Sequence, residues 1–213
     1  MATYDSETAL VNSALVKIGE DRITSLSADT SRRAVIANQQ YPIVRDALLC
    51  RHRWNFALAR ATLAQDATAP EFGFTYRYAL PDDFLHFVGL YDENESAANY
   101  TATETIHKVE GQYVLLDEVE AQCVYIQRVT NTTLFHPLFG EALAWALAAD
   151  LAYHLSQGPG NANRCNAVFE KKLKEAKIAG AFQGTPEIIE ASSWVDSRGG
   201  STYGRGRGPF YWV

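Results

Sequence analysis

The first twenty residues carry apolar side chains at the spacing of an α-helix. Four of them fall on one helical face, namely Val11, Ala14, Leu15 and Ile18. This recurrence every three or four residues predicts a helix over about Ser6 to Ile18. Asp5 or Ser6 can cap its first turn, and Gly19 suits the left-handed position that commonly ends a helix.

A second and longer helix is predicted after a short connector, with Asp29 or Thr30 as its cap. Its apolar positions again recur every three or four residues, at Ala34, Ala37, Tyr41, Val44 and Leu48. Pro42 lies inside this pattern. Because proline removes a backbone donor and clashes with the preceding turn, we expect a kink there.

The middle of the chain changes to the two-residue period of β-strands. Apolar and aromatic residues alternate from Phe72 to Leu80, which predicts a half-buried strand that ends at Pro81. Further strands are predicted over 85–91, 105–110, 112–116 and 122–129, with a polar loop at 92–99. The segments on either side of Gly111 form a predicted hairpin. Together these elements predict one small antiparallel sheet.

Helical spacing returns at Leu134. Between Leu138 and Leu155 the ionisable residues are Glu141, Asp150 and His154, which predicts a helix buried on nearly every side. The alternative is a membrane span. The uninterrupted apolar run between Glu141 and Asp150 is far shorter than the roughly 20 residues that a bilayer requires, so we expect no membrane partner.

A last helix is predicted after Gly158-Pro159-Gly160, which should end the preceding one, with Asn161 or Asn163 as its cap. Its expected inward positions are Cys165, Phe169, Leu173 and Ala176, and its expected outward positions are Lys171, Lys172, Lys174 and Glu175. After Gly184 no helical or strand period continues past Trp194. The Gly, Arg and Ser content of 197–209 predicts a disordered arm.

These patterns predict an α+β fold that is mainly α. We expect a bundle of about four helices with an inserted small antiparallel β-sheet and a flexible C-terminal arm. The predicted divisions are the first half of the bundle over 1–71, the β region over 72–130, the second half of the bundle over 131–183 and the arm over 184–213. An apolar content of 47% is ample for a packed core.

Charge and cysteine content narrow the class of protein. A formal net charge of −6 over 213 residues disfavours nucleic-acid binding by the whole surface and suits a surface past which DNA slides. Cys50, Cys123 and Cys165 are odd in number and form no CxxC pair, which favours a reduced cytosolic protein with structural thiols. Residues 1–5 contain no basic region, so we expect no signal peptide.

Candidate catalytic and metal-binding residues are sparse. Cys50 and His52 are neighbours in sequence, but two positions apart on a helix their side chains diverge, so we interpret them as structural. Asp82 and Asp83 follow Pro81 and suit a turn that bonds its own backbone. The histidines show no metal-ligand spacing, and no phosphate-binding glycine loop is present. We therefore expect that the protein is not an enzyme and that it binds no cofactor and no metal. A tail-associated lysis enzyme is disfavoured because no acid/base pair with a supporting pocket can be named.

The C-terminal arm allows three interpretations. Its basic residues are Arg198, Arg205 and Arg207, and it ends on Phe210, Tyr211, Trp212 and Val213. The arm could be a solvated extension. It could also be a docking arm for a partner, because large aromatic residues anchor interfaces. The third interpretation is a short Arg/Gly segment that binds single-stranded nucleic acid.

Short runs over Leu10 to Leu63 resemble one family in their order and spacing. They are Ala14-Leu15 with Ile18-Gly19, Ser25-Leu26, Asp29-Thr30-Ser31, Tyr41-Pro42, Arg45-Asp46-Ala47-Leu48-Leu49, Trp54-Asn55-Phe56-Ala57, and Arg60 with Leu63. The chain resembles the head-to-tail adaptor proteins of tailed bacteriophages, the group that includes tail tubular protein A. The strand 76–84 also resembles the entry of that family into its β region, and the arm matches least. We interpret Trp54, Asn55 and Phe56 as the family's signature core residues.

The resemblance implies a structural adaptor, or connector, of the virion that assembles in the host cytoplasm. Its expected partners are the portal protein, identical subunits in a ring of about twelve, and a downstream tail or nozzle protein. Double-stranded DNA would pass through the channel of that ring without specific binding. The alternative, from a different class, is a small nucleic-acid-binding protein that uses its Gly/Arg-rich tail.

Overall fold

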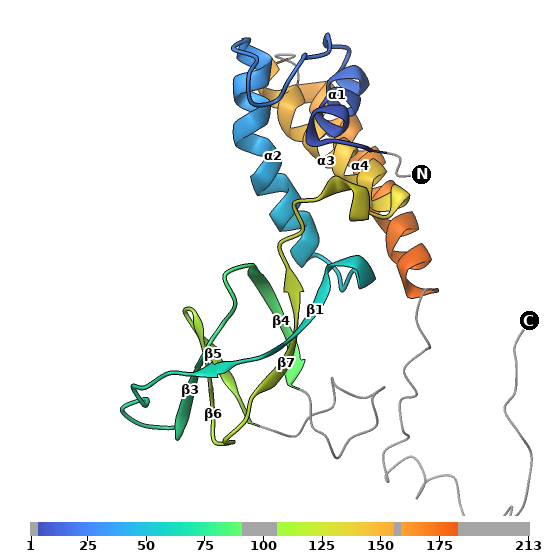
Figure 1. Cartoon of the computed structure of the whole chain (residues 1–213). Coiled ribbons are helices and arrows are strands. Elements are labelled where there is room, and N and C mark those ends of the chain that lie inside the picture. Colours follow the sequence, from blue (N-terminus) through green and yellow to red (C-terminus); the bar gives the residue numbers. More distant parts are fainter. Residues whose placement is uncertain (1–3, 91–105, 156–158, 183–213) are drawn as a thin grey trace, which may run out of the picture.

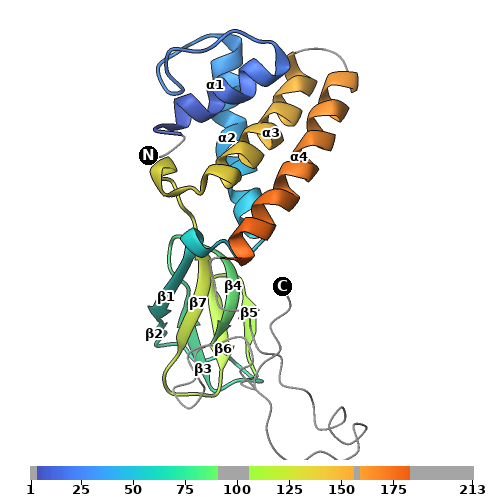
Figure 2. The ribbon, with the colours of Figure 1, turned by 90° about the vertical axis from the view of Figure 1, so that its right-hand side faces the viewer.

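The computed structural model describes residues 4–90, 106–155 and 159–182, and its fold is α+β and mainly α. Its four helices are α1 (Glu7–Ile18), α2 (Arg32–Cys50), α3 (Pro137–Leu155) and α4 (Pro159–Ala181). They form one unit, which we call the helical unit. Between α2 and α3 the chain builds a second unit of antiparallel strands, the β unit, and the two units lie end to end (Figures 1 and 2).

The first two helices begin where short polar side chains can accept bonds from the first turn. The Ser6 hydroxyl accepts from the Ala9 backbone N–H at 3.1 Å, and Gly19 ends α1 with a φ of 84°. α2 begins at Arg32 with Ser31 as its cap, which corrects the expectation of Asp29 or Thr30. The Asp29 carboxylate instead accepts from the backbone N–H of Ser31 at 2.8 Å, so it orders the residue that caps the helix.

α3 is the centre of the helical unit, because it packs against each of the other three helices. Its apolar residues are buried along most of its length, as predicted, and Figure 1 shows it between α2 and α4. α4 begins at Pro159, so Asn161 and Asn163 lie inside it, which corrects the prediction that one of them caps the helix. Proline suits a first helical position because the missing N–H would have had no partner inside the helix. α2 also continues through Pro42 as a single helix.

The β unit consists of two small sheets rather than the single predicted sheet. One has the order β1-β7-β4 and the other the order β2-β3-β6-β5, with every pair antiparallel. The strands are β1 (Leu58–Thr62), β2 (Ala64–Gln65), β3 (Tyr76–Ala79), β4 (Phe84–Leu90), β5 (Lys108–Glu110), β6 (Tyr113–Leu116) and β7 (Gln122–Gln127). The hairpin of β5 and β6 turns at Gly111, whose φ is 60°, so that prediction is confirmed.

The start of the β unit differs from the prediction in two respects. Strands β1 and β2 lie inside 1–71, the range predicted for the first half of the helical bundle, so the β unit begins at Leu58. The predicted strand over Phe72 to Leu80 is shorter, because Gly73 has a φ of 90° that a strand cannot contain. Phe72 is 85% exposed and lies outside the strand.

Two apolar cores follow from this arrangement. The larger fills the helical unit and includes Ile126 near the end of β7 and Val129 from the segment after it. The smaller lies inside the β unit around Tyr78, Val114 and Leu116. Two short 3-10 helices, η1 (Asn55–Ala57) and η2 (Thr132–Leu134), lie where the chain passes between the units. In the described ranges no helix is both long enough and apolar enough to cross a membrane.

Candidate interaction surfaces

The signature run lies at the junction of the two units. Trp54 is 3% exposed, and its indole N–H donates to the Leu48 carbonyl at 3.1 Å. Its ring meets that of Phe139 edge-on, with 4.9 Å between ring centroids. Phe56 lies 4.9 Å from the same ring and packs against the helical core. The prediction that Trp54 and Phe56 are packing residues is therefore confirmed.

Asn55 is not a core residue, which corrects the prediction made for it. Its side chain is exposed and its amide donates to the carbonyl of Gly180 at 3.2 Å. Gly180 lies in the last turn of α4, where backbone carbonyls lack partners within the helix. Asn55 thus connects the junction to the end of α4.

A chain of ion pairs crosses the same junction. Arg45 on α2 is 5% exposed, and its Nε lies 2.8 Å from the Asp46 carboxylate. The other oxygen of Asp46 lies 2.8 Å from the Nε of Arg128, which follows β7. The Arg128 backbone N–H donates to the Asp83 carbonyl at 2.7 Å. Arg45 lies four residues after buried Tyr41, so its inward position was visible in the helical spacing.

A second polar cluster joins α1 to α3 around the carboxylate of Glu141. The Tyr4 hydroxyl and the Trp145 indole N–H donate to it, each at 2.9 Å. The Lys17 ammonium lies 3.4 Å from one of its oxygens. Burial alone would raise the pKa of Glu141, but the Tyr4 bond, the Lys17 charge and the Trp145 bond outweigh burial and lower it. The carboxylate is therefore held in its charged form.

The lowered pKa predicts that the cluster loses its contribution to stability in acid. A carboxyl whose pKa is lower in the folded chain than in the unfolded chain stabilises the fold at pH values above its ordinary pKa of 4.5. That contribution is lost as the pH falls through the folded-state pKa. We expect a loss of about 1 kcal/mol or less, because the pair is partly exposed. Urea unfolding from pH 6 to pH 3 measures it, and Glu141→Gln should remove this component of the pH dependence.

Two of the residues considered for catalysis, Asp83 and His52, have structural partners. Asp83 accepts a bond from the Tyr125 hydroxyl at 3.0 Å. The His52 ring packs edge-on against Trp54 at 4.9 Å, and burial, followed by the charges of Lys177 and Arg53, lowers the pKa of His52. Within the part of the chain that the structure describes, no group of three or more His, Cys, Asp or Glu could hold a metal ion.

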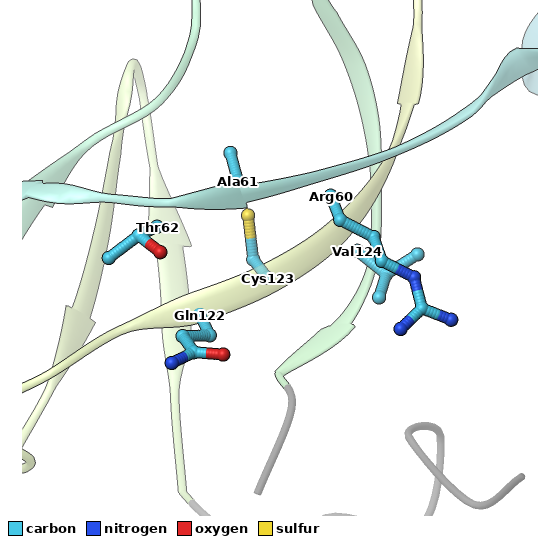
Figure 3. A pocket seen from close by; sticks show the side chains of 6 residues that line it. All are labelled: Arg60, Ala61, Thr62, Gln122, Cys123 and Val124. Carbon is cyan, nitrogen blue, oxygen red and sulfur yellow. The ribbon is translucent and has the colours of Figure 1, made fainter. Parts of the chain in front are cut away.

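A depression of about 350 Å³ lies over the paired strands β1 and β7 (Figure 3). Six residues line it, and two of them, Ala61 and Cys123, also pack in the core of the β unit; the other four are Arg60, Thr62, Gln122 and Val124. This division follows from the two-residue period of strands, since Ala61 and Cys123 are directly paired. The depression contains no acid and base pair, and we assign it no reaction.

Burial of the cysteines predicts how they react. Burial raises the pKa of Cys123 to about 11, and it also raises the pKa of Cys165, which is fully buried. Cys50 is exposed. Partial burial of its thiol and the Asp46 charge raise the pKa of Cys50, while the Arg128 charge acts in the opposite direction. We expect one thiol to react with Ellman's reagent in the native chain and three in denaturant. Cys50→Ser should abolish the native reaction. Rapid native labelling of two or three thiols would contradict this assignment.

One exposed apolar surface lies on the β unit. Residues 66–75, which we call the distal loop, connect β2 to β3 on the side of the β unit away from the helices (Figure 1). Phe72 in this loop is 85% exposed. The loop is held at its base, because the Arg77 guanidinium lies 3.0 Å from Asp66 and 4.3 Å from the centroid of the Tyr113 ring. Single exposed apolar side chains are common on protein surfaces, so Phe72 is a candidate contact residue whose role a substitution can test.

A second apolar surface lies on the helical unit. It is a groove of about 290 Å³ between α2 and α4, with α3 as its floor, and we call it the helical groove. Its apolar lining includes Ile43, Ala47, Ala146, Ala149 and Phe169. At one end the Arg51 guanidinium lies 5.2 Å from the centroid of the Phe169 ring and 3.2 Å from the Glu170 carboxylate. Ile43 is 62% exposed at the edge of the groove.

The predicted docking residues of the arm lie outside the described residues. They are Arg198, Arg205, Arg207, Phe210, Tyr211, Trp212 and Val213. In the fold, the signature run lies at the junction of the two units. The distal loop and the helical groove are two further surfaces that the sequence did not predict. No family model matches the chain, and no curated protein is significantly similar to it.

Proposed function

We propose that the protein is a structural head-to-tail adaptor of a tailed bacteriophage. It forms a ring, of about twelve copies, between the portal of the head and the next protein of the tail or nozzle. The observation that carries this proposal is the ordered set of short matches over Leu10 to Leu63. In the fold these residues belong to four consecutive parts of the chain, namely α1, α2, the junction and β1.

The two exposed surfaces support this proposal. A ring requires heterologous contacts, in which one face of a subunit meets a different face of its neighbour. The distal loop and the helical groove belong to different units, and each presents a large apolar side chain, Phe72 and Ile43. The ion pair of Arg128 with Asp46 links the segment after β7 to α2, while the Arg45 pair lies within α2. Two different surfaces, one on each unit, suit the heterologous contacts of a closed ring.

The experiment that tests this proposal is sedimentation of the full chain with the portal ring encoded in the same genome. We expect saturable binding at one copy per portal subunit, and a ring of density below the portal in electron micrographs. A chain that ends at Ser197 should bind more weakly if the arm docks on the portal. Absence of binding by the full chain would contradict the adaptor proposal.

The distal loop offers a sharper variant for the same experiment. Phe72→Ser removes an exposed ring that packs on no described core, so the melting temperature should stay within about 2 °C of the parent. If the distal loop is a ring contact, assembly on the portal should fall about tenfold or more. Val119→Ser, at a position 68% exposed on the same unit, serves as the matched control. Equal losses in both variants would exclude a specific role for the loop.

The channel wall should carry the acidic excess of the chain. A net charge of −6 keeps DNA from adhering to a surface that it must pass. Lys171, Lys172 and Lys174 on α4 should therefore face away from the lumen, and Lys172 already pairs with Glu175 at 2.8 Å. A ring structure with these lysines lining the lumen would contradict this expectation. Salt-dependent binding of single-stranded DNA, lost on deletion of 198–213, would instead support the nucleic-acid alternative.

A further inference from the structure

The helical groove is an apolar surface without a described occupant. Ile43 and Ala47 on α2 are exposed, and Ala146 and Ala149 on α3 are only half-buried because their small side chains leave space above them. The volume of about 290 Å³ is at the small end of the range for ligand sites and suits one or two aromatic rings. Phe169 at one end offers a ring face against which another aromatic side chain can pack.

We propose that the helical groove binds the aromatic tip of the same chain, Phe210-Tyr211-Trp212. Three consecutive aromatic residues expose a large apolar area if nothing covers them, and such an area drives association in water. The groove offers this tip an apolar surface in the same molecule. The free chain thus shelters its own tip, and a partner that takes up the tip must first displace it from the groove.

The length of chain after α4 favours this occupant over a second copy. Phe169 lies 13 residues before Phe182, so the groove is roughly 20 Å from the end of α4 at the rise of an α-helix. The 27 residues between Phe182 and Phe210 include six glycines. Glycine-rich linkers of that length have a root-mean-square span of about 30 Å in general. Because linker span and distance are similar, the effective concentration of the tip at its own groove is of millimolar order.

One acidic side chain of the groove is opposite in charge to the arginines that precede the tip. Asp150 is exposed and lines the groove, whereas the Arg51 that lines its end is already paired with Glu170 at 3.2 Å. Arg205 and Arg207 lie within five residues of Phe210. Opposite charges around an apolar contact contribute more to orientation and association rate than to affinity. They would therefore orient the tip as it enters the groove.

Competition between the tethered tip and a free copy of it tests the proposal. The probe is a fluorescein-labelled peptide of residues 204–213, and its polarisation is measured with two full-length proteins. One is the parent chain, and the other carries Phe210→Ala, Tyr211→Ala and Trp212→Ala. We expect the peptide to bind the tip variant at least tenfold more tightly than the parent, because the parent's own tip competes for the groove. This ratio should not change with protein concentration in the monomeric range.

Substitutions in the helical groove test whether the peptide binds there. Ile43→Glu in the tip variant should abolish peptide binding, and Ala47→Glu repeats the test if the first variant melts early. Val35→Glu is the matched control, since Val35 lies on the same helix, is 46% exposed and does not line the groove. Equal peptide binding by parent and tip variant would overturn docking within one chain. A competition that grows with protein concentration would assign the groove to the tip of a second copy, and absence of binding would overturn the proposal. None of these outcomes bears on portal binding.

Discussion

Replacing Trp54 with alanine is expected to lower the free energy of unfolding by about 3 to 5 kcal/mol. Trp54 is 3% exposed and packs against Phe139 and Phe56, so truncation leaves a cavity at the junction of the two units. The same change removes the bond from the indole N–H to the Leu48 carbonyl. Urea unfolding followed by circular dichroism measures the loss, because the signal does not depend on the deleted tryptophan.

Trp54→Phe separates packing from hydrogen bonding at this position. It keeps a ring against Phe139 but removes the N–H donor, and the Leu48 carbonyl still accepts from the Arg51 backbone at 3.2 Å. We expect this variant to lose about 1 to 2 kcal/mol, well below the alanine variant. If Trp54→Ala cost less than 1 kcal/mol, the junction would not depend on the signature run. The predicted packing role would then be wrong.

The helices were predictable because local sequence determines most of their features. α1 and α3 each match their predicted range to within about a residue, since their apolar spacing continues for several turns. Their ends were harder to locate. Ser31 rather than Asp29 caps α2, and both are good caps in sequence, so the choice depends on bonds formed only in the folded chain. Pro159 in the sequence indicates the end of the preceding helix, although proline is equally suited to a first turn, and here it begins α4.

The β unit was predicted less well, for two physical reasons. β1 contains two alanines among its five residues, and alanine gives little indication of a strand. Strand order is also a long-range property: β1 pairs with β7, which lies sixty residues further along the chain. Alternation alone therefore gave one sheet in place of two. Phe72 continued the alternating pattern, yet Gly73 turns the backbone out of the strand.

The candidate surfaces required the fold. The pair of Asp46 with Arg128 joins residues 82 positions apart, and no local pattern indicates it. The helical groove exists because Ala146 and Ala149 lie between two helices, while in sequence they are ordinary small residues of an apolar helix. Asn55 shows the opposite case, since it belongs to the signature run but lies on the surface at the end of α4. A family pattern identifies positions without specifying the contact that each one makes.

Replacing Gly140 with alanine is expected to lower the free energy of unfolding by about 2 kcal/mol. In most helices this change stabilises by about 0.5 to 1 kcal/mol, because glycine loses more backbone entropy on folding. At Gly140 an added Cβ would lie 2.5 Å from Cδ2 of Tyr4 and 2.7 Å from its Cε2. The Tyr4 ring cannot move aside freely, since it is 9% exposed and its hydroxyl donates to Glu141 at 2.9 Å.

A double-mutant cycle tests whether the Tyr4 ring causes the destabilisation by Gly140→Ala. In a Tyr4→Ala background the obstructing ring is absent, so Gly140→Ala should become neutral or stabilising by up to about 1 kcal/mol. The interaction between the two substitutions should then be about 2 kcal/mol or more, as measured by urea unfolding of the four proteins. The same destabilisation in both backgrounds would show that Gly140 is needed for another reason. A reversal of the sign of the effect would establish that the Tyr4 ring packs against α3 at Gly140, because glycine has no side chain to obstruct the ring.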